Sequence, residues 1–228
     1  MKALLCGAMA LLFAVPAAAQ VGYDPAKSPY TDLEYKQEIT PIFGYSRARV
    51  DPAGILPQSS AVAGLRYEIH IGGPVAFSSD FTRTFSNRNV IDPTLPAARR
   101  AIGTESAPVY AADLGLVLSV PGRKSWHHVV PQLRGGLGIM ASPAKDSASG
   151  YKFGTPFAFT FGGGLKLVPG GRFQMRADVA ERLFKQTYPD SYFLLASDNT
   201  AVLKDPTPRR FYTHHTVLTV GVSYLFAR

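Results

Sequence analysis

Alternation of apolar and polar residues is the dominant pattern along this chain. It is clearest at 156–168, where Phe157, Phe159 and Phe161 alternate with Ala158 and Thr160. A period of two residues is typical of a β-strand whose two faces meet different environments. The pattern recurs, and it predicts eight strands at approximately residues 35–46, 61–71, 74–85, 109–120, 127–140, 156–168, 171–184 and 213–226.

The connections between these segments alternate in length. Tight turns are expected at 72–74, 121–125 and 169–171, which are rich in glycine and proline, and long loops at 47–60, 86–107, 141–154 and 185–212. Short turns at one end and long loops at the other are typical of transmembrane β-barrels. We therefore predict an all-β fold, an eight-stranded antiparallel up-and-down transmembrane β-barrel, over residues 35–228.

The composition of the polar face decides which face of the barrel points outward. Glycines recur there together with charges of both signs, which suit the crowded interior of a narrow barrel better than a solvated surface. We expect the apolar face to point outward and the charges to pair inside the lumen. The predicted lumen polar network comprises Arg66, Glu68, His70, Asp80, Asp113, Arg134, Lys166, Arg172, Arg176 and Asp178.

Aromatic residues are expected near both ends of the strands. Tyr45, Phe85, Tyr110 and Phe157 fall beside the long loops, and Phe173, Tyr224 and Phe226 beside the short turns. Two such girdles are typical of membrane-spanning barrels. The charges predicted on the outward face, Arg83, Glu181 and Lys185, fall near the loop end. The two cations are candidates for contact with lipopolysaccharide phosphates, and the alternative is that they are solvated rim residues.

The first nineteen residues have the pattern of a secretory signal. Lys2 precedes an apolar run from Ala3 to Val15, and 17–19 is Ala-Ala-Ala, a cleavage site of the A-x-A type. We expect cleavage before Gln20, a periplasmic segment over 20–34, and no cysteine after cleavage, because Cys6 is the single cysteine. Disulfides and thiolate chemistry are then excluded.

The composition agrees with a membrane barrel and limits the partners. Charged residues make up 18% of the chain, below the usual quarter for soluble proteins. The net charge of +8 becomes +7 when Lys2 leaves with the signal, and it favours acidic partners such as anionic lipid. The basic residues are scattered rather than clustered, so we predict no nucleic-acid binding.

Two motifs resemble a known family. The segment 221–226, with Gly221, Tyr224 and Phe226, resembles the sorting signal that the barrel assembly machinery reads on outer-membrane proteins, although Ala227 and Arg228 follow the usual terminal aromatic. The hairpin 162–179 resembles the closing hairpin of the small OmpA-like/OmpX-like eight-stranded barrels. The resemblance implies the outer membrane of a Gram-negative-type bacterium, contact with outer-membrane lipid and lipopolysaccharide, and the assembly machinery as a partner during insertion.

The histidines are the residues that bear on catalysis. We expect His128 and His215 to face the lumen together with His70, because adjacent strand residues point to opposite faces. They are candidate seeds of a lipid A-modifying enzyme, while hydrogen-bonded packing in a polar interior explains them more simply. No Gly-x-Ser-x-Gly or His-Glu-x-x-His motif is present, and we predict no catalytic residue, metal or cofactor.

We therefore predict a non-enzymatic outer-membrane barrel with a structural or surface-interaction role carried by its long loops. The aromatic segment 188–195 is a candidate contact site, with packing within the loop as the alternative. The alternatives for the whole chain are a lipid A deacylase or acyltransferase, a narrow porin-like pore and a soluble periplasmic ligand-binding barrel. The sequence does not identify a surface partner.

Overall fold

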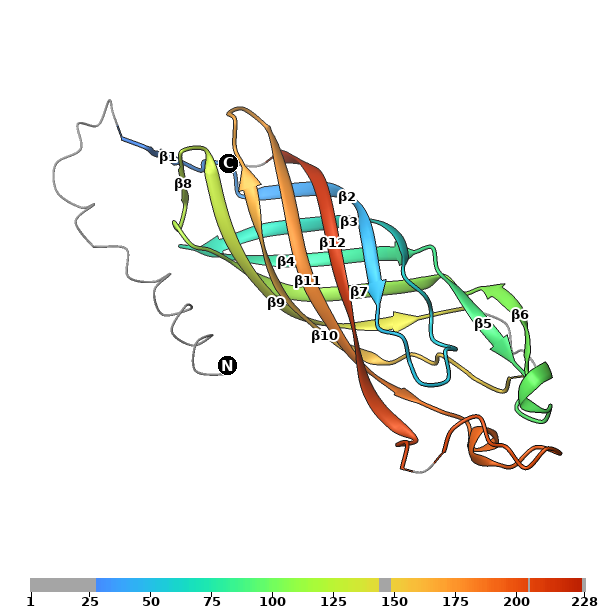
Figure 1. Cartoon of the computed structure of the whole chain (residues 1–228). Coiled ribbons are helices and arrows are strands. Elements are labelled where there is room, and N and C mark those ends of the chain that lie inside the picture. The colour runs from blue at the N-terminus through green and yellow to red at the C-terminus, as the bar shows by residue number, and fades with distance from the viewer. Residues whose placement is uncertain (1–27, 144–148, 205, 227–228) are drawn as a thin grey trace, which may run out of the picture.

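The fold is a closed barrel of eight antiparallel strands (Figure 1). The computed structural model describes residues 28–143, 149–204 and 206–226. Strands follow one another around the barrel in chain order, and the last pairs with the first. They are β2 (Gln37–Ala48), β3 (Ser60–Gly72), β4 (Val75–Thr84), β7 (Val109–Ser119), β9 (Val129–Ala141), β10 (Phe157–Leu167), β11 (Phe173–Thr187) and β12 (Arg210–Phe226). The predicted up-and-down barrel is confirmed, whereas the predicted signal at residues 1–19 lies outside the described residues.

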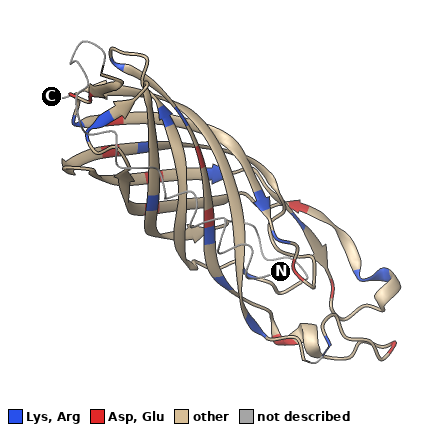
Figure 2. Ribbon diagram, turned by 60° about the vertical axis from the view of Figure 1, so that its left-hand side comes forward, with Lys and Arg blue, Asp and Glu red and all other residues tan. Residues whose placement is uncertain are grey.

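The inside-out arrangement of the side chains is also confirmed. Phe159 and Phe161 on β10 have 48% and 55% of their surface exposed on the outside of the barrel, whereas Arg176 and Asp178 on β11 are 4% and 8% exposed. Apolar side chains thus cover the outer surface while charged side chains fill the lumen. Figure 2 shows charged positions along the strands as well as in the loops.

Interior glycines allow neighbouring strands to approach closely. A Cβ at Gly162 on β10 would overlap the carbonyl oxygen of Val179 on β11, and a Cβ at Gly44 on β2 would overlap that of Leu218 on β12. Glycine inside a strand is otherwise unfavourable. Its presence here follows from the strong coiling that closes a narrow barrel.

β11 and β12 each continue three residues further toward the loop end than the alternation predicts, and four further strands lie outside the barrel wall. β11 and β12 continue as a paired ribbon from Glu181–Thr216 to Thr187–Arg210, where polar outward residues are mixed with Leu183 and Tyr212 and the alternation is weaker. The other additions are β1 (Tyr30–Asp32), which pairs with β8 (Lys124–Trp126), and the hairpin of β5 (Asn87–Ile91) and β6 (Ala101–Ser106). Single turns of 3-10 helix occur at η3 (Ala97–Arg99) and η4 (Asp190–Phe193).

The two ends of the barrel differ in their connections. The turn end carries the short connections β3–β4, β7–β9 and β10–β11, together with β1 and β8, and the loop end carries the four long loops (Figure 1). We name these loops L1 (49–59), L2 (85–108), L3 (142–156) and L4 (188–209). Among the described residues, no helix is long and apolar enough to cross a membrane.

The prediction that β9 begins at residue 127 is wrong. His127 and His128 have φ values of 47° and 64° and form the two-residue turn between β8 and β9. A turn of this kind needs positive φ at both positions to match the twist of the flanking strands. His128 is therefore exposed at the turn end and does not face the lumen.

Candidate functional site

The turn-end half of the lumen holds two carboxylates and two cations in contact. Lys166 Nζ on β10 donates to both oxygens of Glu38 on β2, at 2.8 Å each, and lies 3.5 Å from Glu68 Oε2 on β3. Arg176 Nη1 on β11 lies 3.1 Å from Glu38 Oε1 and 2.8 Å from Glu68 Oε1. All four side chains are nearly fully buried. Each carboxylate therefore faces two cations from strands on other parts of the barrel wall.

A second group continues the network toward the loop end. Arg66 on β3 and Arg134 on β9 both donate to Asp80 on β4. Arg66 Nη1 also lies 2.9 Å from Asp178 Oδ2, which accepts a further bond of 2.9 Å from Arg176 Nε. Asp178 thus connects the two groups into one network.

A third group lies nearest the loops. Arg182 Nη2 on β11 donates to Asp113 Oδ2 on β7 at 2.6 Å, and Thr160 Oγ1 donates to Asp113 Oδ1 at 2.9 Å. His215 on β12 is buried opposite Arg182 on β11. Its ring is edge-on to that of Phe184, with the ring centroids 4.9 Å apart. We name the ten paired side chains of the three groups the lumen network.

The lumen network balances its own charge. Its five carboxylates are Glu38, Glu68, Asp80, Asp113 and Asp178, and its five cations are Arg66, Arg134, Lys166, Arg176 and Arg182. Buried charges are tolerated when each is paired and hydrogen-bonded. A cavity of about 20 Å³ lies among Arg66, Asp80 and Arg182, which is room for about one water molecule. Packed side chains therefore fill the barrel interior at this level.

The structure places eight of the ten predicted lumen residues in this network. His70 is half-buried near the turn end, and its Nδ1 has no hydrogen-bond partner among the described atoms. Arg172 lies outside the lumen, which corrects the prediction: it precedes β11, is exposed, and its Nη1 donates to the Tyr224 hydroxyl at 3.2 Å. The turn before residue 173 breaks the strand alternation on which the prediction for Arg172 depended.

Two charged members of the lumen network were missed from the sequence. Glu38 is the inward neighbour of Ile39 on β2, and Arg182 continues the inward series of Arg176 and Asp178 on β11. Both lie inside the predicted strands 35–46 and 171–184, so the same alternation already placed them on the inward face. Their partners, which lie on non-adjacent strands, have no signal in the sequence.

An apolar cluster closes the loop end of the barrel. It contains Ile55, Leu56, Ile91, Val109, Ala111, Met140, Tyr151, Phe153, Ala158, Phe184, Tyr188, Tyr192 and Leu203. These residues come from all four loops and from the adjoining strand ends. We name this cluster the loop cap.

Polar side chains hold the loops onto the loop cap. Asp51 in L1 accepts bonds from the backbone N–H groups of Ala53 and Leu56 at 3.1 and 3.0 Å, and from the Tyr188 hydroxyl at 2.8 Å. The Tyr151 hydroxyl in L3 donates to Gln186 Oε1 at 2.8 Å. Asp51 therefore joins L1 to L4, and Tyr151 joins L3 to β11.

L2 and L4 are also joined above the loop cap. Arg100 in L2 donates to the carbonyl oxygens of Thr200 and Ala201 at 3.0 and 3.2 Å, and the Ala97 N–H donates to Asp198 Oδ2 at 2.7 Å.

Two carboxylates in these loops have lowered pKa values. Hydrogen bonds from Thr94 lower the pKa of Asp92, and hydrogen bonds from Thr200 lower the pKa of Asp198. Both carboxylates therefore stay ionised where they hold the loop backbone.

The aromatic segment 188–195 packs largely within the loop cap. Tyr188 and Tyr192 are buried, with Tyr188 stacked between Tyr192 and Phe211. Burial raises the pKa of Tyr192 to about 12, and it raises the pKa of Tyr188 and Tyr151 further. For Tyr188 and Tyr192 the structure therefore agrees with packing within the loop, and the exposed side chains of the segment are Leu194 and Leu195, at 65% and 68%.

The histidines do not converge on one site. His128 lies in a turn at the turn end, whereas His215 lies in the lumen toward the loop end, so they cannot act together. Outside the lumen, His214 Nδ1 donates to Glu181 Oε2 at 2.9 Å. Among the described residues, no group of three or more His, Cys, Asp or Glu side chains is arranged to hold a metal ion.

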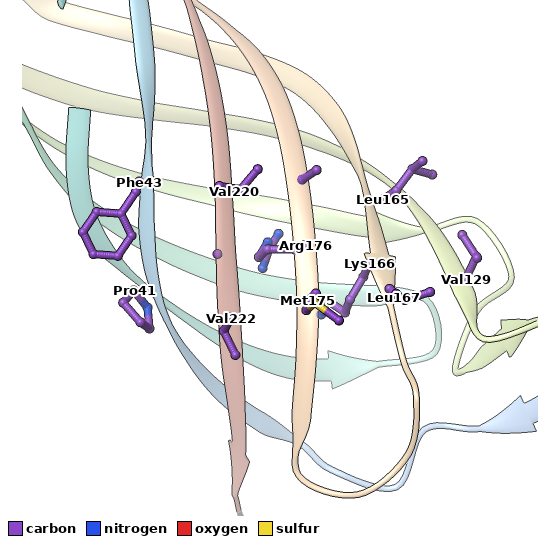
Figure 3. Close-up of a pocket in the computed structure, with 12 residues that line it drawn as sticks. Pro41, Phe43, Val129, Leu165, Lys166, Leu167, Met175, Arg176, Val220 and Val222 are labelled. Atoms are coloured by element: carbon purple, nitrogen blue, oxygen red, sulfur yellow. The ribbon is translucent and has the colours of Figure 1, made fainter. Parts of the chain in front are cut away.

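The outer surface of β2 and β10–β12 carries a shallow apolar groove with a volume of about 590 Å³ (Figure 3). Phe43, Leu165, Met175 and Val220 line it from outside, over the small side chain of Ala177.

The three predicted sorting residues near this surface have different surroundings. Tyr224 faces outward against Phe173 with ring centroids 5.4 Å apart, Phe226 lies 6.3 Å from Tyr67, and Gly221 has no room for a Cβ beside the Pro41 carbonyl oxygen.

Comparison with known proteins identifies the fold. No protein-family model matches the chain, and no curated protein sequence matches it. The crystal structure of Neisserial surface protein A is similar with a TM-score of 0.53 and 13% identity, over 83% of this chain and 97% of that one. The N-terminal barrel domain of Pseudomonas aeruginosa OprF is similar with a lower TM-score of 0.43 and 11% identity, over 83% of this chain and 98% of that one. Yersinia pestis Ail has a TM-score of 0.41 and 18% identity, over 85% of this chain and 100% of that one. The chain has the fold of the small eight-stranded outer-membrane barrels.

Proposed function

We propose that this eight-stranded barrel is an outer-membrane protein with a non-enzymatic role in the cell envelope, as a structural element and as a surface for interaction. The observation that carries the proposal is the outward direction of Phe159 and Phe161 combined with the inward direction of Arg176 and Asp178. Apolar rings outside and paired ions inside suit a hydrocarbon solvent, and they exclude a ligand-binding barrel that would hide its apolar face from water.

The loop end supports the role in interaction. L1 to L4 are held on a rigid barrel by the loop cap, and binding residues concentrate on loops held in this way. Leu194 and Leu195 are the exposed apolar pair of L4, which Arg100 of L2 supports through the Thr200 and Ala201 carbonyl oxygens. This L2–L4 surface is the candidate contact site for a partner outside the cell.

The lumen network favours a closed barrel over a pore. Its ten charges are paired, and the cavity among them has room for about one water molecule. We expect the purified protein to show no steady conductance in a planar bilayer. A stable open level would favour the pore instead.

The location can be tested by membrane fractionation. We expect the processed chain in the outer-membrane band of a sucrose gradient, resistant to alkaline extraction, and cleaved by external protease only within L1 to L4. Recovery in the soluble periplasmic fraction would overturn the proposal. The mass profile of lipid A from a deletion strain tests the enzyme alternative, and we expect an unchanged profile.

A further inference from the structure

The outward surface of three adjacent strands is continuously apolar up to a single row of polar residues. Glu181 on β11 lies opposite Thr216 on β12, which lies opposite Arg47 on β2. On the turn side of this row, the outward residues of the same strands are apolar or aromatic: Met175, Ala177, Val179, Leu218, Val220, Val222, Pro41, Phe43 and Tyr45. Beyond the row the outward residues of β11 and β12 are mixed, with Leu183 and Tyr212 among polar and charged positions. The row therefore marks where the continuous apolar belt ends on this side of the barrel.

Three exposed cations lie at or beyond this row. Arg47 belongs to the row, Lys185 lies opposite Tyr212 two outward positions further along β11, and Arg210 lies opposite Thr187. In the part of the chain that the structure describes, none of the three forms an ion pair. This side of the barrel thus presents unpaired positive charge from the row itself to the loop ends of β11 and β12.

The one outward carboxylate among the described residues of β2, β11 and β12 is already engaged. Glu181 Oε2 accepts a bond of 2.9 Å from His214 Nδ1, and Glu181 Oε1 accepts one of 2.5 Å from Thr216 Oγ1. Neither oxygen contacts Arg47 or Lys185. The cations are therefore left for a ligand from outside the chain.

Next to β11, the outward surface of β10 is aromatic. Phe161 lies opposite Glu181 and Phe159 lies opposite Leu183, with 55% and 48% of their surfaces exposed. β10 carries no outward charge along its length. A ligand that contacts both surfaces must combine an anionic group with apolar chains.

From this arrangement we infer that Arg47, Lys185 and Arg210 bind the phosphate groups of a phosphorylated glycolipid of the outer leaflet, whose acyl chains lie along Phe159 and Phe161. The inference rests on the proposed function, which puts the loop end outside the cell and the apolar belt in the bilayer. Charge complementarity at the belt edge selects an anionic headgroup, because basic side chains at a membrane surface attract anionic lipids.

Arg83 provides a matched control on another side of the barrel. It is an outward cation near the loop end of β4, but its guanidinium lies over the rings of Phe85 and Tyr110, at 4.8 and 5.5 Å from their centroids. Arg83 is the single lysine or arginine of β4, so this strand has no second cation comparable to Lys185 or Arg210. A site built from three cations should therefore be insensitive to the loss of Arg83.

The test measures lipid binding to the folded barrel in detergent by native mass spectrometry. The probes are lipid A with both phosphates, the same lipid A after removal of the phosphates, and phosphatidylglycerol. We expect wild type to prefer phosphorylated lipid A, the R47Q/K185Q/R210Q variant to lose about 100-fold in affinity, and R83Q to bind as wild type. The K185Q/R210Q variant should show an intermediate loss and serves if the triple variant does not fold, as judged by heat-modifiable electrophoretic mobility.

Three outcomes would overturn the inference: unchanged binding in the cation variants, an equal loss in R83Q, or equal affinity of wild type for phosphatidylglycerol or dephosphorylated lipid A. Failure of the proposed function itself is seen separately, as absence of the wild-type chain from the outer-membrane fraction. A chain that is in the outer membrane but binds lipid A independently of these cations contradicts the lipid site alone.

Discussion

Lys166 and Glu38 are 128 positions apart in the sequence and meet across the lumen, with the lysine Nζ 2.8 Å from both carboxylate oxygens. They come from β10 and β2, which are separated around the barrel wall by β11 and β12. Their contact, together with that of Arg176 and Glu68, connects opposite parts of the wall through its interior. The barrel is therefore held closed by its ladder of strands and also by charges in its lumen.

The first prediction concerns this pair. Lys166→Met leaves the buried carboxylate of Glu38 with Arg176 as its remaining close cation, and that of Glu68 with Arg176 and the more distant Arg66, so we expect a loss of about 3 kcal/mol in the free energy of unfolding. Urea unfolding of the barrel in lipid vesicles measures it. Lys204→Met, which removes an exposed lysine of L4, should change stability by less than about 1 kcal/mol. Equal effects of the two variants would show that the lumen pair does not contribute to stability.

The second prediction concerns the close approach of β10 and β11. Gly162→Ala introduces a Cβ that overlaps Val179 and Ala180, and we expect a destabilisation of about 2 kcal/mol. Gly135 on β9 is the control because a Cβ added there would have nothing within 4 Å. Gly135→Ala should be neutral or slightly stabilising, since alanine is easier to order in a strand than glycine. The idea fails if both variants unfold at the same urea concentration.

The third prediction concerns the attachment of L1. Asp51→Ala removes the acceptor for the Ala53 and Leu56 N–H groups and for the Tyr188 hydroxyl, so L1 and L4 should open locally while the barrel stays folded. Hydrogen exchange should accelerate in 49–59 and 188–209. Asp190→Ala, which removes an exposed ion pair with Arg209, serves as the control and should leave exchange in L1 unchanged. Unaltered protection of L1 in the Asp51 variant would contradict this account.

The fourth prediction is a pH dependence of the loop cap. Burial raises the pKa of Tyr192 to about 12, and it raises the pKa of Tyr151 and Tyr188 as well. Because the folded pKa exceeds the unfolded value near 10, the contribution of these tyrosines is complete below about pH 10 and is lost as the pH rises through the folded pKa. Tyrosinate absorbance should therefore rise in two phases in folded protein and in one phase in urea. A single phase in both would show that the three hydroxyl groups are accessible in the folded state.

Much of this architecture can be read from the alternation of residues. Strand positions and face assignments depend on local periodicity, which is why the outward direction of Phe159 and the inward direction of Asp178 were predictable. The same logic failed wherever the backbone leaves the strand. His128 takes a positive φ in a tight turn, and Arg172 precedes β11.

The loops show the limits of sequence periodicity. Segment 188–195 was a candidate contact site with packing within the loop as the alternative, and Tyr188 and Tyr192 lie in a buried cluster with residues from L1, L2 and L3. Nothing in the sequence of L4 indicates which other loops cover it. The β5–β6 hairpin likewise formed within a segment that had the composition of a loop.

The sequence by itself determined that this chain forms eight alternating strands, with one apolar face and one face of glycines and mixed charges, because the side-chain direction in a strand repeats every two residues. Only the tertiary structure decided which charges meet, such as Lys166 with Glu38, and that Glu181, Thr216 and Arg47 form one row. The physical reason is that contacts across a barrel depend on its closure and strand register, which are set by all eight strands together.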